Sequence, residues 1–339
     1  MRGSNTEKGE RRLTGGGKRE EEKMARIGID LGGTNIVAGV VDDGYHILAK
    51  AKRKTAVPRP VEQIVDDMAA CAREAVETAG LTIDRIEAVG VGSPGVCNGH
   101  TGVVERADNL GFSHVPLREM LGARLRKPIG LENDANAAAY AEYLAGAAQG
   151  KKSCVCITLG TGVGGGVVTD GVILTGFNFG GAELGHTVIV MDGEPCSCGR
   201  RGCLEAYASA TALIRQTRRA MQADPGSAMW SLAGSLEAVS GRTAYDGMRA
   251  GDATAAAVVD RYQRYIACGL TNMINIFQPE VLCIGGGICN EGDTLLEPLR
   301  ALVRAEQFGQ DGPQTLICRA KLGNDAGIIG AAYLDGQKA

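Results

Sequence analysis

One feature of this 339-residue sequence constrains its fold more than any other: a strand, a glycine turn and a second strand occur together as a unit, twice. In the first copy, apolar runs at 26–30 and 36–41 flank a turn at 32–35. In the second copy, apolar runs at 154–159 and 164–168 flank a turn at 160–162. One copy in each half of a chain indicates a duplicated domain with a cleft between the two halves.

The remaining periodicity indicates strands that alternate with helices, which is typical of an α/β fold. Further strands are predicted at 45–54, 86–91, 129–132 and 279–284. Apolar residues at helical spacing predict helices at 61–79 and 252–277 and a closing helix at 326–334. An alanine-rich helix follows the strand at 129–132, and we place the boundary between the two lobes there.

Composition and charge disfavour several classes of protein. The net charge of -3 and the isoelectric point of about 5.9 argue against a nucleic-acid partner, which usually selects a basic protein. No run of about 18 apolar residues is present, so no membrane span is predicted. Residues 1–23 lack the apolar segment of a secretory signal, and we interpret them as a disordered extension or a tag. We therefore expect a cytoplasmic protein, with its 11 cysteines present as reduced thiols or as metal ligands.

The glycine turns are suited to binding phosphate groups. Backbone N–H groups in such a turn can converge on an anion, and glycine permits the backbone geometry that this requires. Neither turn is a P-loop or a Rossmann fingerprint, and a single turn of this kind is most often an ordinary hairpin connection. Two matching turns and a third glycine triplet favour phosphate binding. The candidate residues are Gly32, Gly33, Thr34, Asn35, Gly160, Thr161, Gly162, Gly285, Gly286 and Gly287.

Asp30 ends the strand that precedes the first glycine turn. A carboxylate beside a phosphate site repels the phosphate unless a cation lies between them, and Mg²⁺ is the natural cation for that place. The alternative is that the side chain of Asp30 only stabilises the turn.

A cluster of cysteine and histidine predicts a metal site. His186, Cys196, Cys198 and Cys203 lie within 18 residues, and three thiolates with one imidazole match the tetrahedral ligand set of Zn²⁺. All four ligands are protein groups, so the site would be structural and closed to water. The alternative is a chance grouping of unrelated residues. The remaining cysteines are interpreted as small core residues: Cys71, Cys97, Cys154, Cys156, Cys268, Cys283, Cys289 and Cys318.

The segment at 132–136, with the sequence Glu-Asn-Asp-Ala-Asn, lies between a strand and a helix. Asp and Asn are common helix N-caps, and capping alone would explain their presence. The functional interpretation makes Asp134 a general base, which takes the proton of a substrate hydroxyl as that hydroxyl attacks the γ-phosphate of ATP. Asn133 would bind the same substrate, and Glu183 and Glu205, which bracket the metal cluster, would add acceptors for a polyol.

Together these segments resemble the ROK family (repressors, open reading frames, kinases). Asp30-Leu-Gly-Gly-Thr-Asn and Leu159-Gly-Thr-Gly-Val-Gly-Gly-Gly are similar to its two phosphate motifs. The segment at 132–136 is similar to its catalytic motif, and the segments at 183–186 and 196–205 are similar to its sugar and zinc motifs. The triplet at 285–287 is similar to its adenosine segment. The matches follow the family's order from about Met24 to Leu334.

The resemblance implies an α/β, actin-like (ribonuclease H-like) fold of two lobes, with sugar and ATP in the cleft between them. The last helix of such a fold returns to the first lobe. We therefore expect a smaller N-terminal lobe of 24–138 and 328–339, and a larger C-terminal lobe of 139–327 that holds the zinc motif. Family kinases are commonly dimers or tetramers, so a homodimer or a homotetramer is expected.

The resemblance also implies roles for single residues. Asp134 would be the catalytic base, and His186 would serve both the zinc ion and the sugar. His114 stands where the family more usually has Asn or Asp. The residues implied to contact the sugar are Asn109, Asn133, Glu183, His186 and Glu205.

The predicted activity is transfer of the ATP γ-phosphate to the 6-hydroxyl of a hexose. Glucose is the favoured sugar, and the expected cofactors are ATP, Mg²⁺ and a structural Zn²⁺. N-acetylmannosamine, N-acetylglucosamine, allose and fructose remain alternative substrates. A second alternative is a non-catalytic sugar sensor, but repressors of the family carry a winged-helix domain before the kinase-like part, and only 23 residues precede Met24 here. A zinc-dependent nucleic-acid-binding protein is disfavoured by the acidic isoelectric point.

Overall fold

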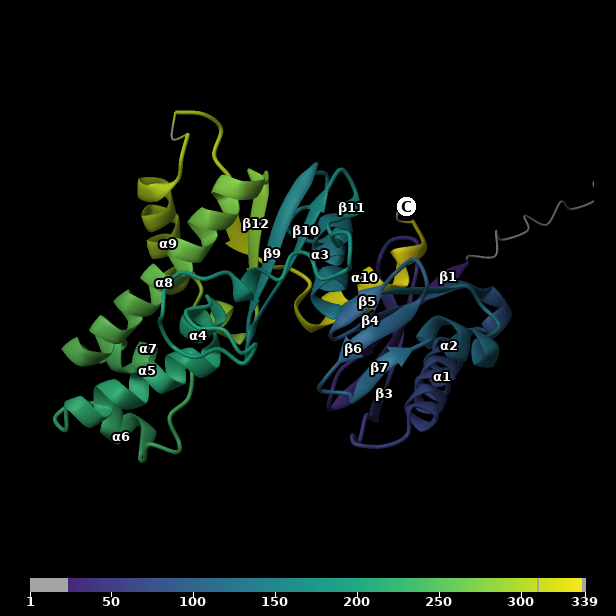
Figure 1. The fold of residues 1–339 in the computed structure, drawn as a ribbon, viewed down its shortest axis with the longest axis horizontal. Coiled ribbons are helices and arrows are strands. Elements are labelled where there is room, and N and C mark those ends of the chain that lie inside the picture. The colour runs from purple at the N-terminus through teal and green to yellow at the C-terminus, as the bar shows by residue number, and fades with distance from the viewer. Residues whose placement is uncertain (1–23, 310, 337–339) are drawn as a thin grey trace, which may run out of the picture.

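The computed structural model describes residues 24–309 and 311–336. In this part of the chain, each of two lobes is built on its own five-stranded mixed sheet (Figure 1). The extension or tag predicted at 1–23 lies outside the described residues. Among the described residues, none of the helices combines the length and the apolar character that crossing a membrane would require.

The N-terminal sheet has the strand order β3-β2-β1-β4-β8. Strands β1, β2 and β3 are antiparallel neighbours, whereas β4 and β8 run parallel to β1. A small three-stranded sheet, β5-β6-β7, follows β4 and was not predicted. The strands of this lobe are β1 (Ala25–Leu31), β2 (Asn35–Val41), β3 (Ile47–Lys54), β4 (Ile86–Ser93), β5 (Val96–Asn98), β6 (Val103–Ala107), β7 (Phe112–Val115) and β8 (Ile129–Asn133).

The C-terminal sheet repeats this plan in the order β11-β10-β9-β12-β13. Its first three strands in sequence are again antiparallel, and its last two again run parallel to the first. The duplication predicted from the two glycine turns is therefore confirmed at the level of topology. The strands are β9 (Ser153–Leu159), β10 (Val163–Thr169), β11 (Val172–Ile173), β12 (Val281–Gly285) and β13 (Leu316–Arg319).

Helices cover both sheets. The longest, α8, buries an apolar stripe against the C-terminal sheet. It begins at Ala253, and the carboxylate of the preceding Asp252 caps it by accepting the Ala255 N–H. The helices are α1 (Val61–Thr78), α2 (Leu117–Leu125), α3 (Asp134–Ala145), α4 (Glu205–Ala208), α5 (Ala210–Ala223), α6 (Met229–Ala233), α7 (Thr243–Arg249), α8 (Ala253–Phe277), α9 (Asp293–Glu306) and α10 (Ala326–Ala332). Single 3₁₀ turns lie at Ile83–Arg85, Leu184–His186, Gly287–Glu291, Gly323–Asp325 and Leu334–Gly336.

Several predicted boundaries were wrong by one or two residues. The strand predicted at 86–91 ends at Ser93, and the strand predicted at 279–284 begins at Val281. The third strand begins at Ile47 rather than at 45, because Tyr45 has a φ of 64° in a turn. The Asp42 carboxylate stabilises that turn by accepting the N–H groups of Gly44 and His46 at 2.9 and 2.8 Å. The closing helix ends at Ala332, before the predicted 334.

The two lobes meet at helices α3 and α10, which pack against each other (Figure 1). Helix α3 also packs on β9 and β10 of the C-terminal sheet, and α10 packs on β1 and β4 of the N-terminal sheet. The chain therefore crosses between the lobes twice, once from β8 into α3 and once from β13 into α10. The division into 24–138 with 328–339 and 139–327 remains a proposal.

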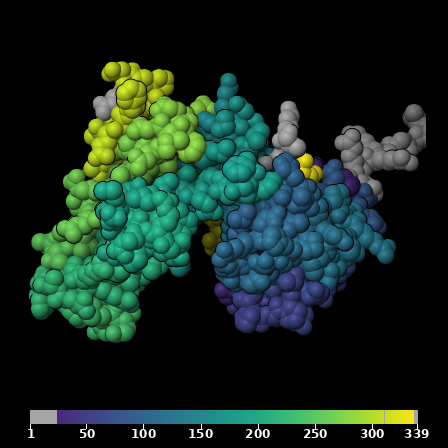
Figure 2. Space-filling view, in the orientation of Figure 1, coloured from purple at the N-terminus to yellow at the C-terminus, as the bar shows by residue number. Residues whose placement is uncertain are grey.

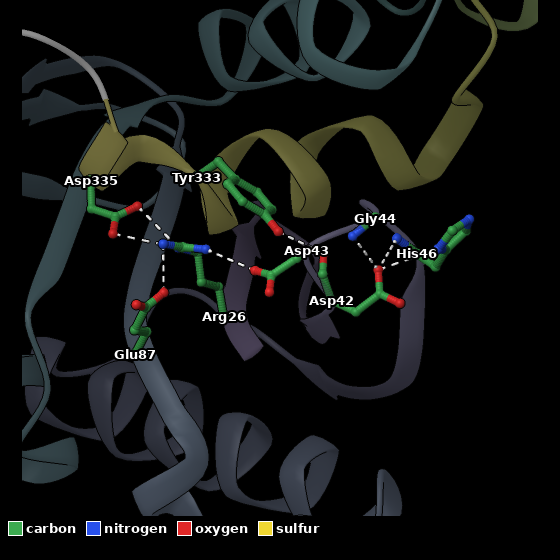
Figure 3. A network of polar contacts seen from close by, with 8 residues as sticks. All are labelled: Arg26, Asp42, Asp43, Gly44, His46, Glu87, Tyr333 and Asp335. Atoms are coloured by element: carbon green, nitrogen blue, oxygen red, sulfur yellow. Dashed lines mark hydrogen bonds and ion pairs between the residues drawn. The ribbon is translucent and has the colours of Figure 1, made fainter. Parts of the chain in front are cut away.

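A polar network holds the end of the described chain on the N-terminal lobe (Figure 3). The guanidinium of Arg26 in β1 pairs with Asp43, Glu87 and Asp335 and lies 4.8 Å from the centre of the Tyr333 ring. The Tyr333 hydroxyl donates to the Asp42 carbonyl oxygen at 2.6 Å. These contacts join β1, the β2–β3 turn, β4 and the residues after α10.

One part of the cysteine interpretation was wrong. Cys156 in β9 and Cys283 in β12 stand opposite each other in the parallel register and form a disulfide, with their Cα atoms 4.8 Å apart. The sequence does not show this pairing because 127 residues separate the two positions. The other predicted core cysteines are free: Cys71, Cys97, Cys154 and Cys289 are buried, and Cys268 and Cys318 are partly buried.

Candidate active site and metal centre

The parallel strands of the N-terminal sheet bring Asp30 and Asp134 together. β1, β4 and β8 end at the same edge of the sheet, with Asp30 opposite Gly92 and Gly92 opposite Glu132. The backbone of Asp134 lies directly over Gly92. Polar residues at the carboxyl ends of parallel strands are the usual position of a site in an α/β fold. Figure 2 shows an open notch between the N-terminal lobe, in purple and blue, and the C-terminal lobe, in green.

Desolvation raises the pKa of both aspartates. Burial raises the pKa of Asp30 from 3.8 to about 6, and the negative charge of Asp134 adds to the shift. Burial also raises the pKa of Asp134, although the Ala135 N–H acts in the opposite direction. Two desolvated carboxylates that repel each other fit a place where a divalent cation binds when the site is loaded.

Asn133, and not Asp134, is the N-cap of α3. Its Oδ1 accepts the N–H groups of Ala135 and Asn136 at 2.9 and 3.2 Å, and its Nδ2 donates to the Gly95 carbonyl oxygen at 3.1 Å. Asp134 is the first helical residue, where the helix dipole favours a negative charge. Capping therefore explains Asn133 but does not explain Asp134, whose carboxylate stands at the cleft end of the helix.

The first glycine turn is held by Thr55 and lies beside Asn109. The Thr55 hydroxyl donates to the Gly32 carbonyl oxygen at 2.6 Å, and the Thr55 N–H donates to the Thr34 carbonyl oxygen at 3.0 Å. Asn109, in the exposed turn between β6 and β7, packs against Gly33. His114 points elsewhere, because it pairs with the Glu105 carboxylate at 2.9 Å on the surface.

The second glycine turn is held by the start of α5 and by Glu205. The Ala210 N–H and the Thr211 hydroxyl donate to the carbonyl oxygens of Gly160 and Thr161, both at 2.8 Å. The Glu205 carboxylate accepts the Val163 N–H at 3.0 Å. A Cβ atom on Gly162 would lie 2.4 Å from this carboxylate, so a larger residue there would force the Glu205 side chain to move.

The four predicted zinc ligands come together as expected. The ligand atoms of His186, Cys196, Cys198 and Cys203 all lie within 4.8 Å of one another. The Cys198 and Cys203 sulfurs are 3.7 Å apart, and the His186 Nδ1 is 3.6 Å from the Cys196 sulfur. A tetrahedral Zn²⁺ with Zn–S bonds of about 2.3 Å places its sulfurs about 3.8 Å apart. The residues present therefore fit zinc in number, chemistry and spacing.

The surroundings shift the pKa values of two of these thiols in opposite directions. Burial raises the pKa of Cys203 to about 12, and the neighbouring thiols add to the shift. By contrast, the Arg200 N–H lowers the pKa of Cys198. A divalent cation would supply the positive charge that lets all three sulfurs bind as thiolates.

The candidate sugar residues of the C-terminal lobe surround this cluster. Glu205 accepts the Ser197 hydroxyl at 2.7 Å and so ties the cysteine loop to the second glycine turn. Glu183 precedes the 3₁₀ turn that carries His186. Desolvation raises the pKa of Glu183, although its side chain is solvent-exposed, and the charges of His186, Asp134 and Glu205 also act on it. The negative charge of Asp134, at the start of α3, therefore acts on Glu183.

A cavity of about 490 Å³ adjoins the third glycine triplet. One wall is α3, through its small residues Ala135, Ala138 and Ala139, and the floor is the end of β9. The opposite wall is the segment 319–326, which we name the nucleotide loop and which joins β13 to α10. The cavity is lined by Gly285, Gly286, Gly287, Arg319, Lys321, Asn324 and Glu142, among others.

Sequence reasoning missed the nucleotide loop and the α3 wall of this cavity. Strand β13 was not predicted, so the sequence did not show that the loop begins at the end of a strand of the C-terminal sheet. The available signals were the glycine-containing polar segment before the closing helix and the run of alanines after Asp134. A larger cavity of about 650 Å³ lies between α5 and α8 and includes none of the predicted site residues.

Comparison with known proteins agrees with this arrangement. The ROK family model matches residues 26–338. A glucokinase of Thermotoga maritima is 41% identical over 315 residues, which cover 92% of this chain and 97% of the relative. An N-acetylmannosamine kinase of Haemophilus influenzae is 32% identical over 91% of this chain and 95% of its own.

A solved structure supports the same assignment. The ROK family glucokinase from Streptomyces griseus, in complex with glucose and AMPPNP, superposes with a TM-score of 0.76. It is 38% identical, and the match covers 91% of this chain and 98% of that one. The actin-like α/β fold predicted from the sequence is therefore confirmed. This chain belongs to the ROK family, because the family model matches nearly its whole length and its relatives match over more than nine-tenths of their own length.

Proposed function

We propose that this protein transfers the γ-phosphate of ATP to the 6-hydroxyl of glucose. The observation that carries the proposal is the position of Asp134. Its carboxylate is desolvated, stands at the cleft end of α3, and is not the helix cap. The two glycine turns, the cavity beside Gly285 and the similarity to glucokinases support the same function.

In the proposed reaction, Asp134 accepts the proton of the glucose 6-hydroxyl as that oxygen attacks the γ-phosphorus. The bond between the γ-phosphorus and the bridging oxygen breaks, and ADP leaves with the electron pair of that bond. Asn133 holds Asp134 in place through the helix cap. Asn109, Asn133, Glu183, His186 and Glu205 are proposed to bind the sugar hydroxyls, so that the 6-hydroxyl faces Asp134.

The glycine turns at 32–35 and 160–162 are proposed to hold the phosphates of ATP through backbone N–H groups, and the cavity beside 285–287 is proposed to hold the adenosine. Asp30 would hold Mg²⁺, directly or through water, and the ion would neutralise the phosphate charge when it is bound. Closure of the two lobes would exclude water, the competing phosphate acceptor.

A structural Zn²⁺ is proposed at His186, Cys196, Cys198 and Cys203. The His186 Nδ1 faces the cysteine sulfurs, so its Nε2 is the ring nitrogen that remains for the sugar. The ion would keep the loop rigid, which matters because Glu205 is joined to that loop through Ser197. A homodimer or homotetramer is also proposed, and sedimentation analysis would test it.

A sugar panel tests the proposed function. ADP release with Mg-ATP would be measured for glucose, mannose, fructose, allose, N-acetylglucosamine and N-acetylmannosamine, against a blank without sugar. We expect the highest kcat/KM with glucose. N-acetylmannosamine is the second candidate, because a relative with that activity covers 91% of the chain. Sugar binding without turnover on any of the six would contradict the kinase proposal.

A further inference from the structure

Glu142 is a buried carboxylate that the chemistry above does not use. It lies in α3, two helical turns beyond Asp134, and is only 2% exposed. Its carboxylate accepts three backbone N–H groups: Ala147 at 2.7 Å and Lys321 at 3.1 Å on Oε2, and Leu322 at 2.8 Å on Oε1. Three N–H donors on one desolvated carboxylate form a strong, specific attachment.

The donors come from two connections that are far apart in sequence. Ala147 follows α3 on the way into the C-terminal sheet, whereas Lys321 and Leu322 belong to the nucleotide loop, 179 and 180 residues from Glu142. A Cβ on Gly146 would lie 2.1 Å from the Glu142 Oε2, so the backbone leaves room for the carboxylate only because this residue is glycine.

The consequence is a rigid link between the nucleotide cavity and the catalytic end of α3. Lys321 lines the cavity, and so do its neighbours Arg319 and Asn324. Asp134 begins the helix in which Glu142 sits near the other end. An α-helix of this length is rigid along its axis. The positions of the loop and of the Asp134 carboxylate are therefore fixed relative to each other.

We propose that Glu142 is a positioning residue that fixes the nucleotide loop relative to the helix bearing Asp134. The proposal rests on the proposed function, because it treats the cavity as the nucleotide site and Asp134 as the base. Glu142 is among the residues that line the cavity, but it is only 2% exposed and its carboxylate is occupied by the three backbone N–H groups. It sets the distance between bound nucleotide and base by holding Lys321 and Leu322 to α3.

Replacement by glutamine separates this role from simple filling of space. The carboxylate offers two acceptor oxygens to three N–H groups, whereas an amide offers one oxygen and turns an NH₂ group toward a donor. Glu142→Gln therefore keeps the side-chain volume and leaves at least one buried loop N–H without an acceptor. The nucleotide loop then loses its attachment to α3. As a result, the nucleotide binds more weakly and its γ-phosphate is less well aligned with the attacking hydroxyl.

The full-length chain would be tested with Glu142→Gln and with Asp252→Asn as the matched control. Asp252 also accepts N–H groups from two segments, those of Ala255 and Ala228, but it lies far from the nucleotide loop and α3. We expect Glu142→Gln to raise the Kd of Mg-AMPPNP and the KM for ATP roughly tenfold and to lower kcat about tenfold or more. The KM for glucose should change little. Asp252→Asn should lower the thermal midpoint without changing either nucleotide constant.

Gly146→Ala provides a second variant, because it displaces the same carboxylate while keeping its charge, and it should shift the nucleotide constants in the same direction. Unchanged Kd and KM for nucleotide in both variants would overturn the proposal, as would equal losses in Asp252→Asn. If the wild-type protein bound AMPPNP but phosphorylated no hexose, the proposed function would fail. The binding measurement would still decide whether Glu142 positions the nucleotide loop.

Discussion

Residues 133 and 134 are neighbours with different roles, one as the cap of α3 and the other as the candidate base. Both side chains can cap a helix, but Asn133 accepts the N–H groups of both Ala135 and Asn136, whereas Asp134 accepts only that of its neighbour Ala135. Asp134 is left as a desolvated carboxylate at the cleft, with a raised pKa. A base in this state holds its proton more readily than an exposed aspartate does, which suits proton transfer from a sugar hydroxyl.

Asp134→Asn should lower kcat by roughly 10²–10⁴-fold, which is the usual contribution of a general base. The cap is untouched and a buried charge is removed, so the variant should unfold at the same temperature as the wild type or higher. Glucose binding by calorimetry and turnover by ADP release would be compared. A variant with near-normal kcat would refute the assignment of Asp134 as the base.

The raised pKa of Asp30 has a consequence for stability. The folded protein without metal binds the Asp30 proton more tightly than the unfolded chain does, since burial raises the pKa from 3.8 to about 6. This contribution to stability is therefore present below about pH 4 and is lost as the pH rises through about 6.

Asp30→Asn removes the ionisable group, so without Mg²⁺ the variant should be about 3 kcal/mol more stable than the wild type above pH 7. The difference should vanish near pH 4, and the variant should lose phosphoryl transfer. Urea unfolding at the two pH values checks the sign. A variant less stable than the wild type at pH 8 would contradict the account. Added Mg²⁺ should narrow the gap by stabilising the wild type alone.

At the scale of elements, the cysteine loop matters because it has no helix or long strand to support it. Its ligands approach one another closely, and Glu205 links it to the second glycine turn. Metal binding in such a loop contributes directly to local folding. Loss of zinc binding is therefore expected to weaken sugar binding as well.

Cys198→Ser should reduce zinc from about one ion per chain. It should also raise the KM for glucose more than the KM for ATP, because the nucleotide cavity lies elsewhere. Cys268→Ser, at a partly buried cysteine in α8 outside the cluster, is the control. Zinc would be measured by mass spectrometry on dialysed protein. A metal-free wild-type protein that is fully folded and active would contradict the structural role.

At the scale of the whole molecule, the two lobes depend on segments that return across the sequence. Helix α10 packs on the N-terminal sheet, and the residues after it are held by Arg26 (Figure 3). The Arg26 side chain is 19% exposed and serves three carboxylates. Such a shared, half-desolvated cation contributes more than an isolated surface pair.

Arg26→Met should lower the free energy of unfolding by about 1–2 kcal/mol, because three carboxylates lose a common partner while the apolar stem is retained. Arg264→Met is the matched control, since among the described residues Arg264 forms a salt bridge with the exposed Asp260 along one helix face and with no second carboxylate. That variant should change the free energy by less than about 0.5 kcal/mol. Equal losses in the two variants, measured by urea unfolding, would show that the network adds nothing.

Short-range features of the sequence determined much of what this protein is. The glycine turns, the strand and helix periods, and the cysteine and histidine spacing predicted the duplication, the α/β class and the grouping of the four metal ligands. The resemblance of these segments to the ROK family implied the actin-like fold. These features can be predicted from the sequence because each depends on backbone geometry or on a ligand set within about one turn or one loop. The exact ends of strands and the identity of the helix caps could not be predicted, since neighbouring residues compete for the same N–H groups.

The tertiary structure alone decided which distant groups meet. Asp30 faces Asp134 because β1, β4 and β8 end at one edge of a sheet, and Cys156 meets Cys283 because β9 and β12 pair in a particular register. Glu142 reaches Lys321 across 179 residues for the same reason. Register and helix packing are cooperative properties of whole sheets, and no local pattern specifies them. The sequence by itself therefore determined the parts of the site, and only the packing of the two lobes decided how those parts act on one another.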